Sequence, residues 1–272
     1  MPIAGTCRLC AAADVELVDS HVIPSWAYKR IRKQASSDPL LNNPNPVRMR
    51  GSTAVQLSNQ IEEPMLCIDC EQRFGVQENW FKRVTEAEEH ALPRLSDLLD
   101  PARPMIDHEH SLARAGRLDT DALAYFALSV FWRAHECSKS SDFSLEDRNA
   151  DAIRLWLDGK AAPPSQISLT AYYCEQGYVD RHDLVSAFKT PASSGGLSVF
   201  VIACMVSVLY ETRQPTDGHP CLLHSADKAL VVAPLSMITG PLGARIATSE
   251  AKGALRRYGD ARRSARNRSA DR

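Results

Sequence analysis

The spacing of hydrophobic positions beyond residue 70 predicts an amphipathic helix. Four side chains recur at helical spacing and share one face: Glu71, Phe74, Glu78 and Phe81. The pattern continues towards Glu89, and Pro93 ends or kinks the helix because proline lacks a backbone N–H. We expect the two phenylalanines to pack against the N-terminal module that carries the cysteines, and Glu78 to be solvated.

A second helix is predicted behind a polar stretch. Residues 100–117 contain two prolines and are interpreted as a linker. Asp119 or Thr120 can cap a helix over residues 122–136, because either side chain can accept a hydrogen bond from the first turn. That helix is apolar almost all round, so we expect it to be buried scaffold.

The rest of the chain combines one more helix with short strands. Ser144 and Asp147 form a start that resembles a capping box, and Gly159 can end the helix in a left-handed conformation. Polar turns then separate four apolar runs, at residues 167–174, 184–189, 197–211 and 228–235. These runs predict three or four antiparallel strands, although the third run could also be a buried helix.

The elements together predict an α+β fold in three parts. Residues 1–99 form a cysteine-bearing module, and residues 100–254 form a helical segment followed by a small antiparallel sheet, with no role assigned. Residues 255–272 carry seven arginines and few apolar residues, which predicts a disordered tail. Such a tail is either merely solvated or a phosphate-binding arm.

Composition limits the kinds of partner. The formal charge of −1 and pI near 6.7 argue against a grip on nucleic acid by the whole molecule, so any such contact must be local. The N-terminus lacks the features of a secretory signal, and the longest apolar run, residues 197–209, is shorter than the roughly 20 residues that cross a bilayer. We therefore expect a cytoplasmic protein that has no membrane partner.

Four of the eight cysteines form two C-x-x-C pairs. Cys7 and Cys10 form the first knuckle, and Cys67 and Cys70 form the second. Two such pairs can complete a closed tetrahedron of thiolates around Zn²⁺, which predicts a structural rather than a hydrolytic zinc site. The alternative is that the first pair is a redox pair. The remaining cysteines stand singly among apolar residues and are expected in the core: Cys137, Cys174, Cys204 and Cys221.

The sequence around the knuckles resembles one nuclease superfamily. Ser20, His21 and then Val-Ile-Pro follow the first knuckle, residues 36–52 form a long polar loop, and the second knuckle opens a helix. From Thr6 to Phe81 this order resembles the treble-clef form of the HNH, or ββα-metal, endonucleases. The resemblance implies that His21 is the general base, that Glu71 occupies the last motif position as a cation ligand, and that a separate Mg²⁺ or Mn²⁺ assists catalysis.

The chain also departs from the family pattern. Ser20 stands where the family usually has an acidic residue that helps to bind the cation, and Glu62 and Glu63 lie near the position of its central asparagine, with Asn59 the nearest asparagine. His21 is thus either catalytic or only a structural hydrogen-bonding residue beside the zinc site. His108 and His110, in the linker, are expected to be solvent-exposed.

A local basic run follows the histidine motif: Lys29, Arg30, Arg32 and Lys33. It is either a solvated helix face or a phosphate contact. The sequence therefore predicts a zinc-stabilised, HNH-like endonuclease whose partner is nucleic acid, with DNA favoured. The alternative is a non-catalytic zinc-knuckle protein that binds nucleic acid, or binds a protein through its C-terminal region.

Overall fold

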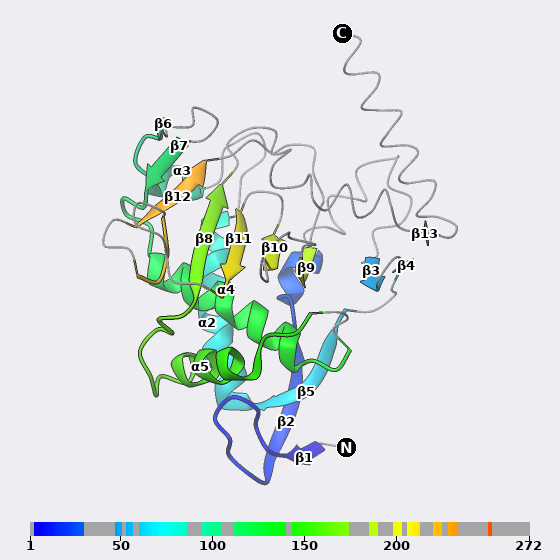
Figure 1. Ribbon diagram of the computed structural model, residues 1–272. Helices are drawn as coiled ribbons and strands as arrows, with labels where there is room; N and C mark the ends of the chain where they lie inside the picture. Colours follow the sequence, from blue (N-terminus) through cyan, green and yellow to red (C-terminus); the bar gives the residue numbers. More distant parts are fainter. Residues whose placement is uncertain are drawn as a thin grey trace.

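A computed structural model describes most of the N-terminal and central parts of the chain. The described residues are 3–29, 47–50, 53–56, 60–85, 94–104, 111–139, 143–173, 185–189, 198–202, 206–212, 220–224, 228–232 and 250–251. They form an α+β fold, as predicted, with three sheets and the helices α2 to α5 (Figure 1). The arginine-rich tail, residues 255–272, lies outside the described residues.

The N-terminal sheet is antiparallel and has the strand order β1-β2-β5. Its strands are β1 (Ile3–Gly5), β2 (Val15–His21) and β5 (Glu62–Cys67). The first knuckle lies between β1 and β2, and Cys67 ends β5 opposite Leu17. This register brings the two knuckles to the same end of the sheet and leaves His21, opposite Glu62, at the other end of the β2–β5 pair.

Helix α2 (Ile68–Thr85) follows β5 directly and carries Cys70 in its first turn. Phe74 and Phe81 are fully buried on it, as the helical spacing requires. Phe74 meets Trp132 of α4 edge-on, and Phe81 stacks on Phe126 of α4 with centroids 4.2 Å apart. Phe81 also contacts Trp26 of the N-terminal module, with ring centroids 6.4 Å apart. The aromatic face therefore packs against the N-terminal module, as predicted for Phe81, and also joins α2 to the middle of the chain.

Helix α4 (Thr120–Glu136) is buried on nearly every side, as predicted. Asp119 is its N-cap, and the carboxylate accepts a hydrogen bond from the Ala122 N–H at 2.9 Å. Helix α3 (Arg94–Leu98) is one short turn beside α2.

Helix α5 (Asp147–Leu157) ends as predicted but starts differently. Gly159 has φ +75°, and its N–H and that of Lys160 bond to the last turn, to the carbonyls of Trp156 and Leu155 respectively. The N-cap is Glu146, and its side chain makes no capping hydrogen bond, so the predicted start at Ser144 is wrong. Helix α4 packs against both α5 and α2.

The second sheet is larger than predicted and is not wholly antiparallel. Its strands, in spatial order, are β6 (Arg103–Pro104), β7 (Ser111–Arg114), β12 (Ala229–Val232), β8 (Ser168–Tyr173), β11 (Val206–Glu211), β10 (Ser198–Ile202) and β9 (Val185–Lys189). β12 and β8 run parallel. β6 and β7 occupy the stretch interpreted as a linker, and the apolar run from residue 197 forms the antiparallel pair β10–β11.

The excursion between the knuckles contains a hairpin. β3 (Val47–Arg50) pairs with β4 (Thr53–Gln56), and β13 (Glu250–Ala251) adds a parallel strand beside β4. The prediction of a loop over residues 36–52 is therefore wrong for β3, while residues 36–46 lie outside the described part.

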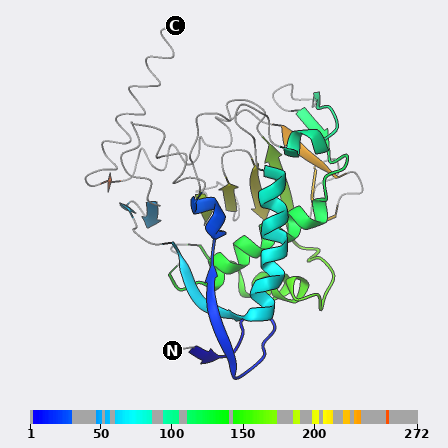
Figure 2. The same ribbon diagram turned by 180° about the vertical axis from the view of Figure 1, so that it is seen from behind.

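One hydrophobic core links the N-terminal module to the later elements. It runs from Leu66 and Phe74 through Phe126 on α4 to Leu169 and Val208 in the seven-stranded sheet. In Figures 1 and 2 that sheet and the β1-β2-β5 sheet lie at opposite ends of the molecule, with α4 between them. None of the helices in the described part has the length and apolar character needed to cross a membrane.

Candidate metal centre and adjoining histidine site

The four predicted cysteines come together at one end of the N-terminal sheet. The sulfur atoms of Cys7, Cys10, Cys67 and Cys70 all lie within 4.8 Å of one another. Cys7 and Cys70 are buried, and the other two are partly exposed. Within the described residues this is the one group of three or more histidine, cysteine or acidic side chains close enough to hold a metal ion.

The sulfur spacing fits a tetrahedral metal. Zn–S bonds of about 2.3 Å give tetrahedron edges of about 3.8 Å, and the Cys10 and Cys67 sulfurs are 3.9 Å apart. That separation is also far longer than the roughly 2.05 Å of a disulfide. Four thiolates suit a soft or borderline ion and leave no coordination position for water. The residues present can therefore hold a structural metal such as zinc.

The backbone around the first knuckle favours a thiolate at Cys7. Burial raises the pKa of the Cys7 thiol, but N–H groups of Cys10, Cys67 and Leu9 outweigh it and lower that pKa to about 7. At Cys10 and Cys70 burial prevails and raises the pKa of the thiol. The Cys67 N–H donates to the Cys7 sulfur at 3.3 Å. The turn closes through Ala11, which adopts the left-handed conformation with φ +63° and donates to the Cys7 carbonyl at 2.9 Å.

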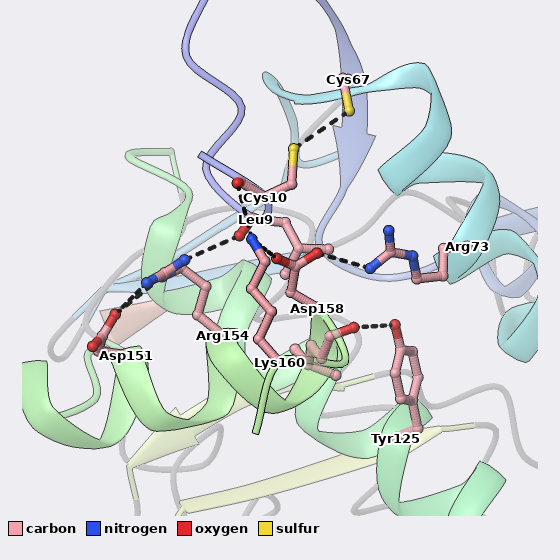
Figure 3. Close-up of polar contacts among 10 residues, drawn as sticks. Leu9, Cys10, Cys67, Arg73, Tyr125, Asp151, Arg154, Asp158 and Lys160 are labelled. Atoms are coloured by element: carbon pink, nitrogen blue, oxygen red, sulfur yellow. Dashed lines mark hydrogen bonds and ion pairs between the residues drawn. The ribbon is translucent and has the colours of Figure 1, made fainter. Parts of the chain in front are cut away.

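The C-terminal end of α5 docks on the first knuckle through cationic side chains (Figure 3). Arg154 Nη1 donates to the Leu9 carbonyl at 3.2 Å, and Lys160 Nζ donates to the Cys10 carbonyl at 3.4 Å. Asp158 lies between Lys160 and Arg73 of α2, at 2.6 and 2.9 Å. The knuckle is thus held by residues about 150 positions further along the chain.

Asp158 is the anionic centre of this junction. Its side chain is only 3% exposed. Desolvation tends to raise the pKa of Asp158, but the hydrogen bonds from Lys160 and Arg73 hold it below its usual range. The carboxylate therefore stays ionised at neutral pH and joins α2 to the end of α5.

Glu63, near the position of the family's central asparagine, has a structural role. It pairs with Arg8 of the first knuckle at 2.7 Å and accepts two hydrogen bonds from Ser138, at the end of α4. Arg8 also donates to the Glu136 carbonyl. Desolvation acts to raise the pKa of Glu63, but the Ser138 donors and the Arg8 charge lower it overall. Glu63 therefore ties the knuckle to α4.

His21 ends β2 and pairs with a carboxylate from the neighbouring strand. Its Nε2 atom lies 2.8 Å from Oε2 of Glu62, the residue opposite it in the register. The His21 side chain is 26% exposed, so solvent can reach it. With Nε2 directed at a carboxylate, a neutral ring carries its proton there and leaves Nδ1 as the free acceptor.

Ser20 and Glu71 join the strand that bears His21 to helix α2. The buried Ser20 hydroxyl donates to Glu71 Oε2 at 2.6 Å, which joins β2 to the first turn of α2. Burial raises the pKa of Glu71, and Glu78 adds to this, whereas Ser20, Arg133 and His21 act to lower it.

Glu78 is not solvated, which corrects the prediction. Its side chain is 15% exposed and pairs with Arg133 of α4 at 2.6 Å. Arg133 is completely buried and also donates to the His21 carbonyl at 2.6 Å. The sequence held a signal for this residue, because an arginine inside an apolar helix needs a buried partner.

Of the basic run after the histidine motif, the structure describes one residue. Lys29 is exposed at the end of a helical segment over residues 25–29. The other three, Arg30, Arg32 and Lys33, lie outside the described residues, as do His108 and His110. Their predicted roles stay predictions.

The single cysteines and histidines behave as ordinary structural residues where the structure describes them. Cys137 and Cys221 are buried, as predicted, and Cys174 and Cys204 are not among the described residues. His135 accepts a hydrogen bond from the Leu145 N–H at 3.1 Å, and the His224 ring bonds to the Pro164 carbonyl.

Comparison with known proteins assigns no family. No protein-family model matches the chain, and no curated protein or solved structure is significantly similar to it. The fold and the site themselves define an α+β protein with four cysteines placed closely enough to hold a metal ion. At the other end of the β2–β5 pair lies a partly exposed histidine held by a carboxylate.

Proposed function

We propose that this chain is a zinc-stabilised, HNH-like endonuclease that cleaves phosphodiester bonds in nucleic acid, with DNA favoured. The arrangement of His21 carries the proposal: the histidine ends a strand, pairs with Glu62 and stays accessible to solvent. The element order supports it, since a knuckle, the strand bearing His21, a second strand and a helix opened by the second knuckle resemble the treble clef of that superfamily. Zinc in the four-cysteine site holds the strand against the helix and takes no part in the chemistry.

His21 acts as the general base. Its Nδ1 lone pair takes a proton from the attacking water while Glu62 stabilises the imidazolium that forms. An imidazole suits this step because its usual pKa lies near neutral pH. Partial exposure allows a phosphodiester to approach the ring.

Glu71 is the ligand proposed for a divalent cation, Mg²⁺ or Mn²⁺. Outside the four cysteines, no cluster of three metal ligands occurs among the described residues, so the protein would supply one or two oxygens. Such sparse protein ligation is normal for Mg²⁺, which binds one or two carboxylates and is completed by substrate phosphates and water. When bound, the cation would neutralise charge on the scissile phosphate.

The basic run is the proposed phosphate contact. Lys29 is exposed and lies eight residues after His21, at the end of the short helical segment over residues 25–29. Lysine and arginine contacts to phosphates position the substrate without reading its sequence. Activity should therefore fall steeply with added salt.

The direct test is nicking of supercoiled plasmid by the full chain with Mg²⁺ or Mn²⁺. His21→Ala should retain zinc and fold but lose nicking, while His224→Gln, a histidine bonded only to a backbone carbonyl in the described structure, should nick like the wild type. Parallel reactions with single-stranded DNA and RNA identify the substrate. A wild type that nicks nothing with either cation, across a range of salt, overturns the enzyme proposal.

One observation favours the non-catalytic alternative. The buried guanidinium of Arg133 pairs with Glu78, and its positive charge also acts on Glu71. These carboxylates therefore already have a compensating positive charge without a metal ion, and one oxygen of Glu71 accepts a hydrogen bond from Ser20. A protein built this way could use the module as a platform that binds nucleic acid without cleaving it. Salt-dependent binding in a gel-shift assay, without nicking, would select this alternative.

A further inference from the structure

The buried guanidinium of Arg133 joins three separate elements. From α4 its Nη1 atom donates to the carbonyl of His21 in β2 at 2.6 Å, and the same Nη1 atom lies 2.6 Å from Oε1 of Glu78 in α2. Within α4, Ser129 accepts from Nε through its carbonyl and from Nη2 through its hydroxyl, at 3.3 and 3.4 Å. The guanidinium carbon lies 5.2 Å from the centre of the Phe74 ring.

Stability alone does not explain this arrangement. Burial of an ion pair is costly, and replacing a buried pair by apolar side chains of similar size is often neutral or stabilising. What the guanidinium supplies is geometry: Ser129 holds Nε and Nη2, and because the guanidinium is planar and rigid, this fixes Nη1 against its two acceptors. The two acceptors here belong to the strand that carries His21 and to the helix that carries Glu71.

The end of β2 has few other supports. β1 pairs only with residues Val15–Leu17, so among the described strands the His21 end of β2 is paired with β5 alone. The last backbone contacts there are His21 opposite Glu62 and the bond from the Val22 N–H to the Ile61 carbonyl at 3.1 Å, while the Ser20 hydroxyl ties the preceding residue to Glu71 of α2. Arg133 adds an anchor at the backbone of His21 itself, the residue whose side chain must be placed.

We infer that Arg133 is a positioning residue: by holding the His21 carbonyl and Glu78 together, it fixes the His21 imidazole relative to the first turns of α2. The inference rests on the proposed nuclease function, since positioning matters where His21 must meet a reacting water. Arg133 itself touches no reacting atom. A small displacement of a base can cost about a hundredfold in rate, so the loss should appear in kcat rather than in KM.

The experiment compares Arg133→Lys with Arg148→Lys, an exposed arginine on α5 that serves as the matched control. Lysine keeps the charge but lacks the planar group whose Nε and Nη2 atoms Ser129 holds, so its ammonium is not fixed against the two acceptors. We expect Arg133→Lys to keep its zinc, to lose about tenfold or more in kcat with KM within about twofold, and to shift the His21 and Val22 backbone NMR signals. Arg148→Lys should change none of these. In a His21→Ala background, Arg133→Lys should cause no further loss of residual nicking, because the two residues act as a unit.

Other outcomes separate the inference from the proposed function. Full kcat in a folded Arg133→Lys variant, or unmoved His21 signals, overturns the positioning role. If that variant does not fold, Glu78→Gln removes the partner charge and should lower kcat in the same direction; an unchanged kcat also overturns it. If the wild type does not nick at all, the nuclease proposal fails, and the His21 NMR signals alone decide whether Arg133 fixes that residue.

Discussion

Removal of the metal from the four-cysteine site should unfold more than the knuckles. A metal that joins Cys10 to Cys67 closes a loop across 57 positions. For a cross-link of that span, the chain-entropy model gives about 4 kcal/mol of stabilisation through the unfolded state. This is a large share of the roughly 5 to 15 kcal/mol that stabilises a typical domain. Because the same hydrophobic core continues into α4 and the seven-stranded sheet, the loss should extend to those elements.

The assay is thermal unfolding followed by circular dichroism, with and without a strong zinc chelator, together with elemental analysis. A loss of about 4 kcal/mol should lower the Tm by about 10 °C in a chain of this size. Cys10→Ser should reproduce the shift without chelator. Cys221→Ala is the matched control, because that cysteine is buried but lies outside the cluster. The Cys221→Ala variant should still contain one equivalent of zinc.

Two results would refute this reasoning. Metal removal that leaves the Tm unchanged would mean that the cysteines do not clamp the two segments. Less than about half an equivalent of zinc in gently purified protein would contradict a site of four thiolates, whose affinity should be high.

Three further predictions concern stability. Gly116→Ala should destabilise the protein more than Gly159→Ala. Both glycines have positive φ, but a Cβ at Gly116 would lie 2.7 Å from a backbone oxygen, whereas a Cβ at Gly159 meets nothing within 4 Å. Urea unfolding should give a loss of about 1 kcal/mol in the free energy of unfolding for Gly159→Ala. Asp119→Ala should cost about 1 kcal/mol through loss of the N-cap of α4, and Glu146→Ala, which removes no capping bond, should cost clearly less. Asp158→Asn should lower the free energy of unfolding at neutral pH. The difference from the wild type should vanish as pH falls through the lowered pKa of Asp158 in the folded state, because the wild-type carboxylate is then protonated. A difference that does not change with pH would contradict the ion-pair assignment.

Local chemistry made part of this structure predictable. The ligand cluster follows from two C-x-x-C turns, since each turn brings its own pair of sulfurs together. The N-cap of α4 at Asp119 and the positive φ of Gly159 follow from the few residue types that suit those backbone positions. The burial of Phe74 and Phe81 follows from helical spacing.

What the sequence could not supply depends on distant partners. Glu78 looks like any surface glutamate until Arg133, which lies on another helix, pairs with it. β7 looks like a polar linker because its burial comes from pairing with β12, more than a hundred residues later. The size of the second sheet likewise depends on which strands pair, and that is decided by the whole chain rather than by local patterns.

The contacts of the first knuckle have a consequence for protein engineering. Its carbonyls are held by Arg154 and Lys160, and the aromatic face of α2 rests on α4. A fragment cut at residue 99 would keep every metal ligand, yet it would expose Phe81 and lose both cationic anchors. Unlike a simple zinc finger, this module is not portable: grafted onto another protein, it would have to bring α4 and α5 with it.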